Sequence, residues 1–218
     1  MRASALNPSE FRFLADTDRC YHYGEYTSGG GYKASDTNRQ ILNLKKKPSA
    51  SDYELQHKAR AVVYWGKVIL TSTGLNLESC SRTVTFVPMP CSKPADHPDY
   101  DDRMSRVMRY VSKQTPNGLD VRELLVQTIA RQAQHSGPRS EPGDIAASLS
   151  INQELLIPPI RSTIIVVDDV ITRGASFAAA KSLLEDVPGV QQVYGLFLAK
   201  TVHPPIEWPV DPIDDLLA

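Results

Sequence analysis

The sequence has little cysteine and no long apolar run. Its three cysteines, Cys20, Cys80 and Cys91, are odd in number and widely spaced, so they make neither a disulfide framework nor a zinc pattern. A reducing cytoplasm is the simplest setting for such a chain, and we expect a cytoplasmic protein. The first residues lack the apolar segment of a signal peptide, and no apolar stretch approaches the roughly 18 residues of a membrane-spanning helix. We therefore expect neither export nor a membrane span.

The chain also lacks a strong net charge. The formal net charge is −1 over 218 residues, with ordinary hydrophobic (41%) and charged (22%) contents, which favours one globular domain with embellishments. No overall basic field points to a nucleic-acid partner, although a local patch stays open. The run Lys45–Lys47 precedes Pro48 at the end of a predicted helix, and we interpret it as a solvated helix end rather than a nucleic-acid contact.

The most informative stretch is 163–186. Its first five residues, Thr163–Val167, are apolar or β-branched without alternation, which is typical of a strand buried on both faces of a parallel sheet. Asp168 and Asp169 end that run, and a short turn with Gly174 leads into a predicted helix. The turn therefore offers amides and hydroxyls at a helix N-terminus, where the helix dipole favours an anion.

We interpret this arrangement as a site for a sugar phosphate. Open α/β sheets bind ligands at the carboxyl ends of their strands, and both acids follow such an end. The turn would take the phosphate, while Asp168 and Asp169, lying beyond the buried part of the strand, would accept hydrogen bonds from two ribose hydroxyls or hold a metal ion. The alternative is a buried strand that ends in solvated acids and is followed by a helix N-cap. The Thr-x-Gly-x-Ser spacing of the turn favours the site.

The run Val166–Ser176, Val-Val-Asp-Asp-Val-Ile-Thr-Arg-Gly-Ala-Ser, resembles the phosphoribosyl diphosphate (PRPP) signature of type I phosphoribosyltransferases. It departs from the usual family pattern at Arg173, where a small residue or Thr is common, and at Ser176, which keeps the hydroxyl of the commoner Thr. Receiver domains also carry an acidic pair, but theirs follows the first strand, whereas most of this chain precedes the pair. The resemblance implies binding of PRPP with Mg²⁺ and transfer of its phosphoribosyl group to a base or an amine.

The resemblance also implies roles for individual residues. Asp168 and Asp169 would take the ribose diol and Mg²⁺, and Arg173 would add a charge-assisted contact to the phosphate. Lys93, in the loop after an early strand, would bind the pyrophosphate or else be an ordinary surface lysine. Arg139, in a Gly-, Pro- and Ser-rich segment, would reach the leaving pyrophosphate when a flexible loop closes, unless that segment is an ordinary mobile loop. The full set comprises Thr172, Arg173, Gly174, Ala175 and Ser176 for the 5-phosphate, Ser92 and Lys93 for the pyrophosphate side, and Asp168, Asp169, Lys93 and Arg139 as the catalytic group.

A looser similarity covers more of the chain. An aromatic N-terminal strand, the run Asn43–Lys46, a Val-Pro-Met-Pro turn and the late Asp-Asp-Val-Ile-Thr element follow the order found in the ComF group, phosphoribosyltransferase-like proteins linked to DNA uptake. That group usually has a zinc-binding cysteine cluster ahead of this domain, which this chain does not carry. Related domains also occur in bacterial antiphage modules, and the sequence does not separate these contexts.

Three functional classes stay open. The first is a transferase with an unidentified acceptor. Some purine-salvage members have an acid that contacts the base where Thr172 stands, and its absence here speaks against purine salvage. The second class is a non-catalytic regulator or effector subunit that senses PRPP or a nucleotide. The third, a structural partner in a nucleoprotein complex, rests only on the lysine run and the acidic tail. A homodimer or a larger protein complex is compatible with each class.

Alternating strand and helix patterns predict the fold. We expect a doubly wound, mainly parallel α/β sheet of the type I phosphoribosyltransferase kind. Residues 1–50 should form a small hood-like embellishment with a hairpin and a short helix, 51–202 the core, and 203–218 a Pro-rich acidic tail. Within the core we expect one helix that begins at a capping box at Ser51 and another that is capped by Asp120.

Overall fold

Six strands form the main sheet of this protein, in the order β1-β2-β8-β7-β3-β4. The computed structural model describes residues 1–130 and 141–204. Neighbouring strands are parallel except β1 and β2, which confirms the predicted α/β class with a mainly parallel sheet. The strands are β1 (Ser4–Ala5), β2 (Cys20–Thr27), β3 (Val84–Pro88), β4 (Asp120–Val121), β7 (Thr163–Ile171) and β8 (Gln192–Val202). A separate antiparallel pair consists of β5 (Leu125–Gln127) and β6 (Leu149–Ile151).

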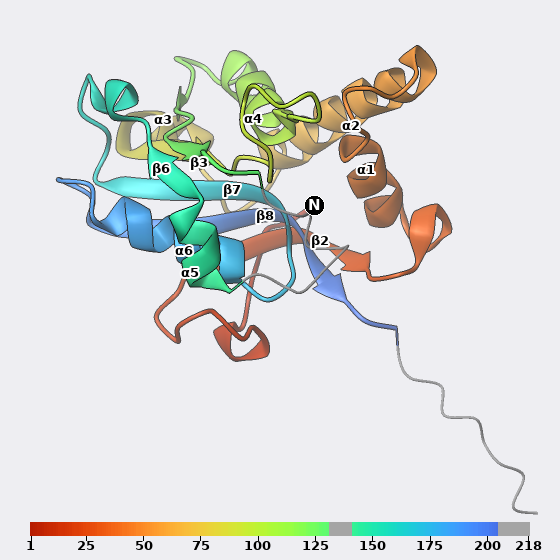
Figure 1. The fold of residues 1–218 in the computed structure, drawn as a ribbon, viewed down its shortest axis with the longest axis horizontal. Helices are drawn as coiled ribbons and strands as arrows, with labels where there is room; N and C mark the ends of the chain where they lie inside the picture. Colours follow the sequence, from red (N-terminus) through yellow and green to blue (C-terminus); the bar gives the residue numbers. More distant parts are fainter. Residues whose placement is uncertain (131–140, 205–218) are drawn as a thin grey trace, which may run out of the picture.

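Helices lie on both faces of this sheet. They are α1 (Asp36–Leu44), α2 (Asp52–Leu70), α3 (Leu77–Thr83), α4 (Arg103–Gln114), α5 (Pro142–Ala147) and α6 (Ala175–Glu185), with the short 3-10 helices η1 (Pro8–Glu10), η2 (Gly31–Lys33) and η3 (Gln153–Leu156). Figure 1 shows α5 and α6 on one side of the sheet and α1, α2 and α4 on the other. Among the described residues, no helix has the length and apolar character that crossing a membrane requires.

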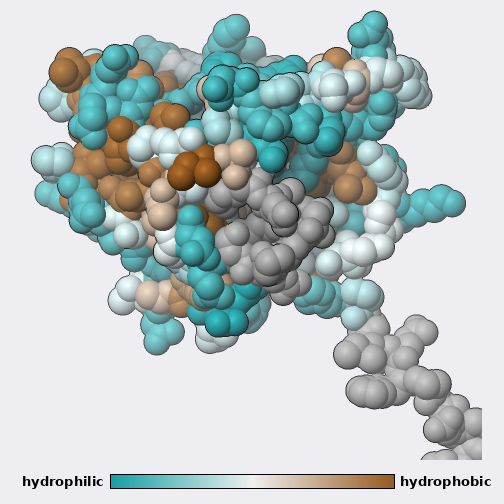
Figure 2. Space-filling view, viewed as in Figure 1, coloured by the Kyte–Doolittle hydropathy of each residue, from teal (hydrophilic) through white to brown (hydrophobic). Residues whose placement is uncertain are grey.

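The side chains of β7 alternate between two hydrophobic cores. Ile164 and Val166 pack in the core that includes α6, whereas Ile165 and Val167 pack in the core built with α1, α2 and α4. Successive residues of a strand point to opposite faces of the sheet, so the predicted run without alternation reflects burial on both sides. Figure 2 shows that hydrophobic surface gathers mainly on the side that carries β6 and the beginning of β7, opposite the carboxyl ends of β7 and β8.

The predicted helix after Asp120 is wrong. Asp120 pairs with Thr85 at the edge of the sheet, and β4 and β5 follow instead of a helix. The Asp120 carboxylate accepts hydrogen bonds from the Thr85 hydroxyl and the Arg122 guanidinium, both at 2.7 Å, rather than from helix amides. Leu124 and Leu125 are buried as expected, because apolar residues without a clear period suit a short strand as well as a helix.

The N-terminal segment is only partly as predicted. The capping box at Ser51 and Glu54 is present at the start of α2. β1 and β2 form an antiparallel pair, as expected for a hairpin, but β2 also pairs in parallel with β8 along its length. Residues 20–27 therefore belong to the main sheet instead of standing apart from it.

Candidate functional site

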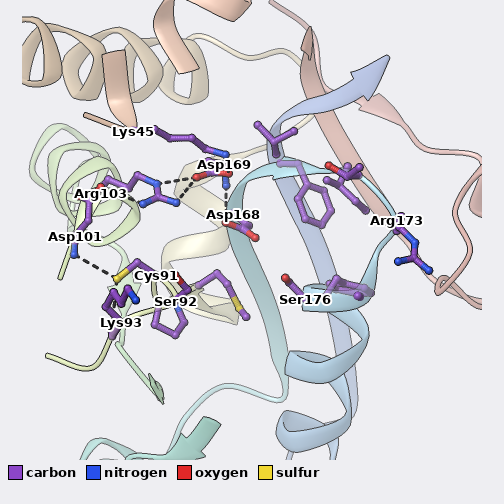
Figure 3. A pocket seen from close by; sticks show the side chains of 18 of the residues that line it. Lys45, Cys91, Ser92, Lys93, Asp101, Arg103, Asp168, Asp169, Arg173 and Ser176 are labelled. Atoms are coloured by element: carbon purple, nitrogen blue, oxygen red, sulfur yellow. Dashed lines mark hydrogen bonds and ion pairs between the residues drawn. The ribbon is translucent and has the colours of Figure 1, made fainter. Parts of the chain in front are cut away.

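A cavity of about 670 Å³ opens at the carboxyl ends of β3 and β7 (Figure 3). Four parts of the chain line it: the segment after α1, the connection from β3 to α4, the end of β7 with its turn into α6, and β8 through Phe197. The lining residues are Lys45, Lys47, Pro48, Met89, Pro90, Cys91, Ser92, Lys93, Asp99, Asp101, Arg103, Phe197 and the continuous run 168–177. The two predicted acids, Ser92, Lys93 and the turn 172–176 therefore meet at one cavity. The predicted Arg139 lies outside the described residues.

The turn 172–176 presents backbone amides to the cavity. Gly174 is the N-cap of α6 and has a φ of 85°, in the left-handed region that favours glycine. A Cβ at this position would lie 2.9 Å from Cδ2 of Leu14, so the Leu14 side chain would have to shift to admit a larger residue. The Ala178 amide donates to the Gly174 carbonyl at 2.9 Å, whereas among the described residues none of the amides of 173–177 donates to another backbone group. Such amides at a helix N-terminus can bind an anion.

Two hydroxyls flank these amides. The Thr172 hydroxyl lies 2.7 Å from the hydroxyl of Thr201 on β8, which fixes its position at the edge of the cavity. Figure 3 shows the Ser176 side chain in the first turn of α6, on the side of Asp168. The amides and hydroxyls together form a neutral wall suited to a phosphate group.

The structure does not provide the contact expected from the Arg173 side chain. Its guanidinium lies over the ring of Phe13, 4.7 Å from the centroid, and 3.5 Å from a carboxylate oxygen of Glu141. Figure 3 shows it directed away from Asp168 and Ser176. A guanidinium stacks favourably on an aromatic face and pairs with a carboxylate, so Arg173 connects the turn to Phe13 of the N-terminal segment.

Asp169 is held in a buried network of ion pairs. One carboxylate oxygen lies 3.0 Å from the Lys45 ammonium, and the other accepts from Nε and a terminal nitrogen of Arg103 at 2.7 and 2.6 Å. Arg103 also pairs with Asp101 at 3.0 Å, and Asp101 pairs with Lys58 at 2.7 Å. Burial alone would raise the pKa of Asp169, but Lys45 and Arg103 hold that pKa well below its usual range. Asp169 is therefore a permanent anion whose oxygens are both engaged.

Asp168 has a different environment. One of its oxygens accepts the backbone amide of Asp169 at 2.7 Å, and within the described chain the other has no hydrogen-bond partner. Burial, followed by the charge of Asp169, raises the pKa of Asp168 to about 7. Asp168 is therefore the acid that is free to interact with a ligand.

The alternation of side chains along β7 explains why the two neighbouring acids have different environments. Because side chains alternate across the sheet, Asp168 continues the α6 side of β7 and Asp169 continues the side of α1 and α4. The expectation that both acids lie beyond the buried part of the strand is wrong for Asp169, which is only 4% exposed.

The lysine run is not a solvated helix end. Helix α1 ends at Leu44, and each following lysine has an acidic partner: Lys45 with Asp169 at 3.0 Å, Lys46 with Glu54 at 3.0 Å and Lys47 with Asp99 at 3.1 Å. Only the Lys47 side chain is largely exposed, at 71%. Lys45 and Lys47 line the cavity, so the run contributes to the candidate site.

Ser92 and Lys93, which were predicted for the pyrophosphate side, lie in the loop after β3 and line the cavity. Cys91 accepts the Asp101 amide at 3.3 Å, which connects the loop to the start of α4. Figure 3 shows Lys93 and Ser92 beside Cys91 on the wall opposite Ser176. The Lys93 ammonium makes no ion pair with the part of the chain that the structure describes, so it remains available for an anion.

Of the two predicted acids, Asp168 is the one with an oxygen available for Mg²⁺. No group of three or more His, Cys, Asp or Glu side chains within residues 1–130 and 141–204 could hold a metal ion. Both oxygens of Asp169 are engaged, which leaves Asp168 as the carboxylate for such an ion. Mg²⁺ commonly takes one or two carboxylates together with phosphate oxygens of a substrate, so Asp168 would hold it in company with a ligand.

The fold is α/β, and the cavity lies at the carboxyl ends of two neighbouring parallel strands, where such sheets commonly bind ligands. Comparison of the sequence with models of protein families and with curated proteins finds no match. The cavity also contains five charged residues that the sequence pattern did not assign to it: Lys45, Lys47, Asp99, Asp101 and Arg103. The two lysines next to Lys45 gave a signal of charge, but no local pattern indicates that Lys45 pairs with Asp169.

Proposed function

We propose that this chain binds PRPP together with Mg²⁺ and transfers the phosphoribosyl group to a base or an amine, with release of pyrophosphate. The fold would then be of the type I phosphoribosyltransferase kind, and the run 166–176 would be its PRPP-binding element.

The observation that carries this proposal is the arrangement of the turn 172–176. Its unpaired amides stand at the N-terminus of α6, next to the free carboxylate of Asp168. A wall that bears Lys93 faces them across the cavity. A ligand with a phosphate at one end, a diol in the middle and further anionic groups at the other end has a matching partner for each part.

In the proposed reaction the bond from C1 of the ribose to the pyrophosphate oxygen breaks, and a bond from C1 to the acceptor nitrogen forms. The turn would hold the 5-phosphate, Asp168 would accept hydrogen bonds from the ribose hydroxyls, and Ser92 with Lys93 would hold the pyrophosphate. Bound Mg²⁺ would neutralise charge on the departing pyrophosphate. The residues thus contribute by fixing both ends of the substrate and by stabilising developing charge.

Thermal unfolding with ligands tests the proposal. A ligand that binds only the folded state at about a hundredfold excess over its dissociation constant stabilises it by about 2.7 kcal/mol, or roughly 5–10 °C for a domain of this size. PRPP with Mg²⁺ should raise the melting temperature by that amount, EDTA should remove much of the gain, and ribose 5-phosphate should give less. The absence of a shift with PRPP and with every nucleoside monophosphate would contradict the proposal.

A non-catalytic PRPP- or nucleotide-sensing subunit is the second candidate, in keeping with the similarity to ComF-like proteins of DNA uptake or antiphage defence. The observation that favours it is Asp169, whose two oxygens are already occupied by Lys45 and Arg103, so one free carboxylate remains at the ligand. The two candidates differ in pyrophosphate release. PRPP binding without release from any base or amine supplied would favour the sensor.

A further inference from the structure

The two walls of the cavity differ in how they would hold an anion. The wall formed by the turn 172–176 offers backbone amides and hydroxyls. The opposite wall carries the cationic side chains of Lys45, Lys47, Lys93 and Arg103. The sequence assigns only Lys93 to that wall, so the question is which of the other cations can reach a ligand.

Arg103 is engaged through all three of its nitrogens, which uses three of its five N–H donors and balances its charge with two carboxylates. Its Nε and one terminal nitrogen bind Asp169, and its other terminal nitrogen binds Asp101. Lys47 is paired with Asp99 at 3.1 Å and its side chain is largely exposed, so its position is weakly fixed and its charge is screened by solvent. Both residues line the cavity, but the charge of Arg103 is already balanced by two carboxylates and that of Lys47 is screened.

Lys45 is different. Its ammonium has three N–H donors, and the only partner it has among the described residues is one oxygen of Asp169 at 3.0 Å. The side chain is 23% exposed, and the residue lines the cavity. Two donors therefore remain for a group that occupies the cavity.

Asp169 fixes the position of that ammonium. A free lysine loses considerable side-chain entropy when it binds a ligand, but Lys45 is already held by a buried carboxylate. Arg103 occupies the other oxygen of the same carboxylate and so holds the carboxylate in turn. Figure 3 shows the Lys45 ammonium beside Asp169, on the same side of the cavity as Arg103 and Lys93.

We infer that Lys45 is a ligand-binding residue that forms, together with Lys93, a two-point subsite for the pyrophosphate end of the ligand. This inference rests on the proposed function for the identity of the whole ligand, but the subsite itself requires only a diphosphate. Asp169 and Arg103 are positioning residues that act through Lys45. Lys45 lies far from the signature in sequence, and α1 brings it to the cavity.

Calorimetric titration of three probes tests the inference: inorganic pyrophosphate, ribose 5-phosphate and PRPP, each with Mg²⁺. Lys45→Met should weaken pyrophosphate and PRPP binding by about tenfold to a hundredfold, the range of a charge-assisted hydrogen bond. Ribose 5-phosphate binding should change by less than about threefold, because its phosphate occupies the opposite wall. Lys45→Arg, which keeps the charge, should retain most of the pyrophosphate affinity.

Lys46→Met is the matched control. It removes the same charge one residue further along, from a side chain that pairs with Glu54 and does not line the cavity. It should leave the binding of all three probes unchanged. A purely structural Lys45 would show equal losses for pyrophosphate and ribose 5-phosphate in Lys45→Met, and that result would overturn the inference.

The outcomes separate the inference from the proposed function. Pyrophosphate binding that depends on Lys45, without PRPP binding, supports the subsite and contradicts the transferase. If Lys45→Met leaves the binding of PRPP and of pyrophosphate unchanged, the subsite is overturned and the proposed transferase function is unaffected. Failure of the intact chain to bind any of the three probes overturns both.

A measurement on the unaltered chain covers the case in which Lys45→Met does not fold. Lysine acetylation read by mass spectrometry should be slowed at Lys45 and Lys93 by pyrophosphate with Mg²⁺, and not at Lys46. Equal acetylation of Lys45 with and without pyrophosphate would overturn the inference.

Discussion

The two walls of the cavity are built in opposite ways. The turn 172–176 and the start of α6 form a neutral wall from consecutive residues, whose amides are free because of where they stand in a helix. The other wall joins Lys45, which follows α1, to Lys93 and Arg103 from the connection between β3 and α4, and buried ion pairs hold Lys45 and Arg103 in place. Local sequence determines the first wall, whereas the tertiary fold determines the second.

Asp168 and Asp169, which are adjacent in the sequence, also differ in their environments. Asp168 lies on the α6 side with a free oxygen, and Asp169 lies on the α1 and α4 side with both oxygens engaged. We therefore assign ligand binding to Asp168 and positioning to Asp169, although the sequence presents them as an equal pair.

The largest expected effect is that of Asp169→Asn on stability. Removing one member of a buried ion network leaves Lys45 and Arg103 without their counter-charge and should cost about 3–5 kcal/mol, or roughly 10 °C in melting temperature. Asp168→Asn should not lower the melting temperature. Circular dichroism on the two variants makes the comparison, and equal melting temperatures would remove the distinction between the acids.

Gly174→Ala tests the neutral wall. The left-handed φ of 85° and the approach of Leu14 to within 2.9 Å of an added Cβ should together cost about 1–3 kcal/mol and displace the amides that we propose to bind phosphate. Gly189→Ala is the matched control, since Gly189 has a φ of 92° with no atom within 4 Å of an added Cβ. Only Gly174→Ala should also reduce the thermal shift produced by ribose 5-phosphate. A full ligand shift in Gly174→Ala would argue against phosphate binding at the turn.

The raised pKa of Asp168 gives a prediction for the ligand-free protein. Because burial and the charge of Asp169 raise this pKa from its ordinary 3.8 to about 7, the folded protein retains a proton there that the unfolded chain releases. The stabilising effect is complete below pH 3.8 and is lost as the pH rises through about 7. Relative to Asp168→Asn, the intact chain should therefore lose about 1–2 kcal/mol of stability between pH 5 and pH 8, a figure reduced because the carboxyl is partly open to solvent. Urea unfolding at the two pH values measures this difference, and parallel pH profiles would contradict it.

Arg173→Thr should have the smallest effect. Arg173 lines the cavity, but its guanidinium contacts Phe13 and Glu141 and is directed away from Asp168 and Ser176 (Figure 3), so the loss should be about 1 kcal/mol or less of stability. Affinity for PRPP, measured by calorimetry, should change by less than about threefold. A tenfold loss of affinity would mean that the side chain turns toward the phosphate when a ligand is bound.

Whether a residue's position was predicted correctly depends on whether local sequence or tertiary contacts determine that position. The buried run Thr163–Val167, the glycine turn and the presence of a helix after it were predicted correctly, because burial on both faces and a glycine in a turn are visible in the sequence. The strand itself continues to Ile171 and includes both acids. The helix expected at Asp120 was wrong because its carboxylate serves the sheet edge through Thr85. In the sequence alone, an aspartate that caps a helix cannot be distinguished from one that forms hydrogen bonds at the edge of a sheet.

Apart from Lys93, the cationic wall could not have been predicted from a local pattern. Lys45 and Asp169 are separated by most of the chain, and their ion pair depends on α1 packing beside β7. The direction of the Arg173 side chain could not be predicted from local sequence either. Its position within the signature suggested a phosphate contact. Phe13, which attracts its guanidinium, belongs to a segment with no sequence relation to the turn.

Calorimetric titration of the intact chain and of Asp168→Asn with PRPP and Mg²⁺ tests the central claim most directly. The account predicts one PRPP bound per chain by the intact protein, and a loss of at least about tenfold in affinity for Asp168→Asn at an undiminished melting temperature. PRPP binding that Asp168→Asn leaves unchanged, or no binding by the intact chain, would contradict the assignment of this cavity as a PRPP site.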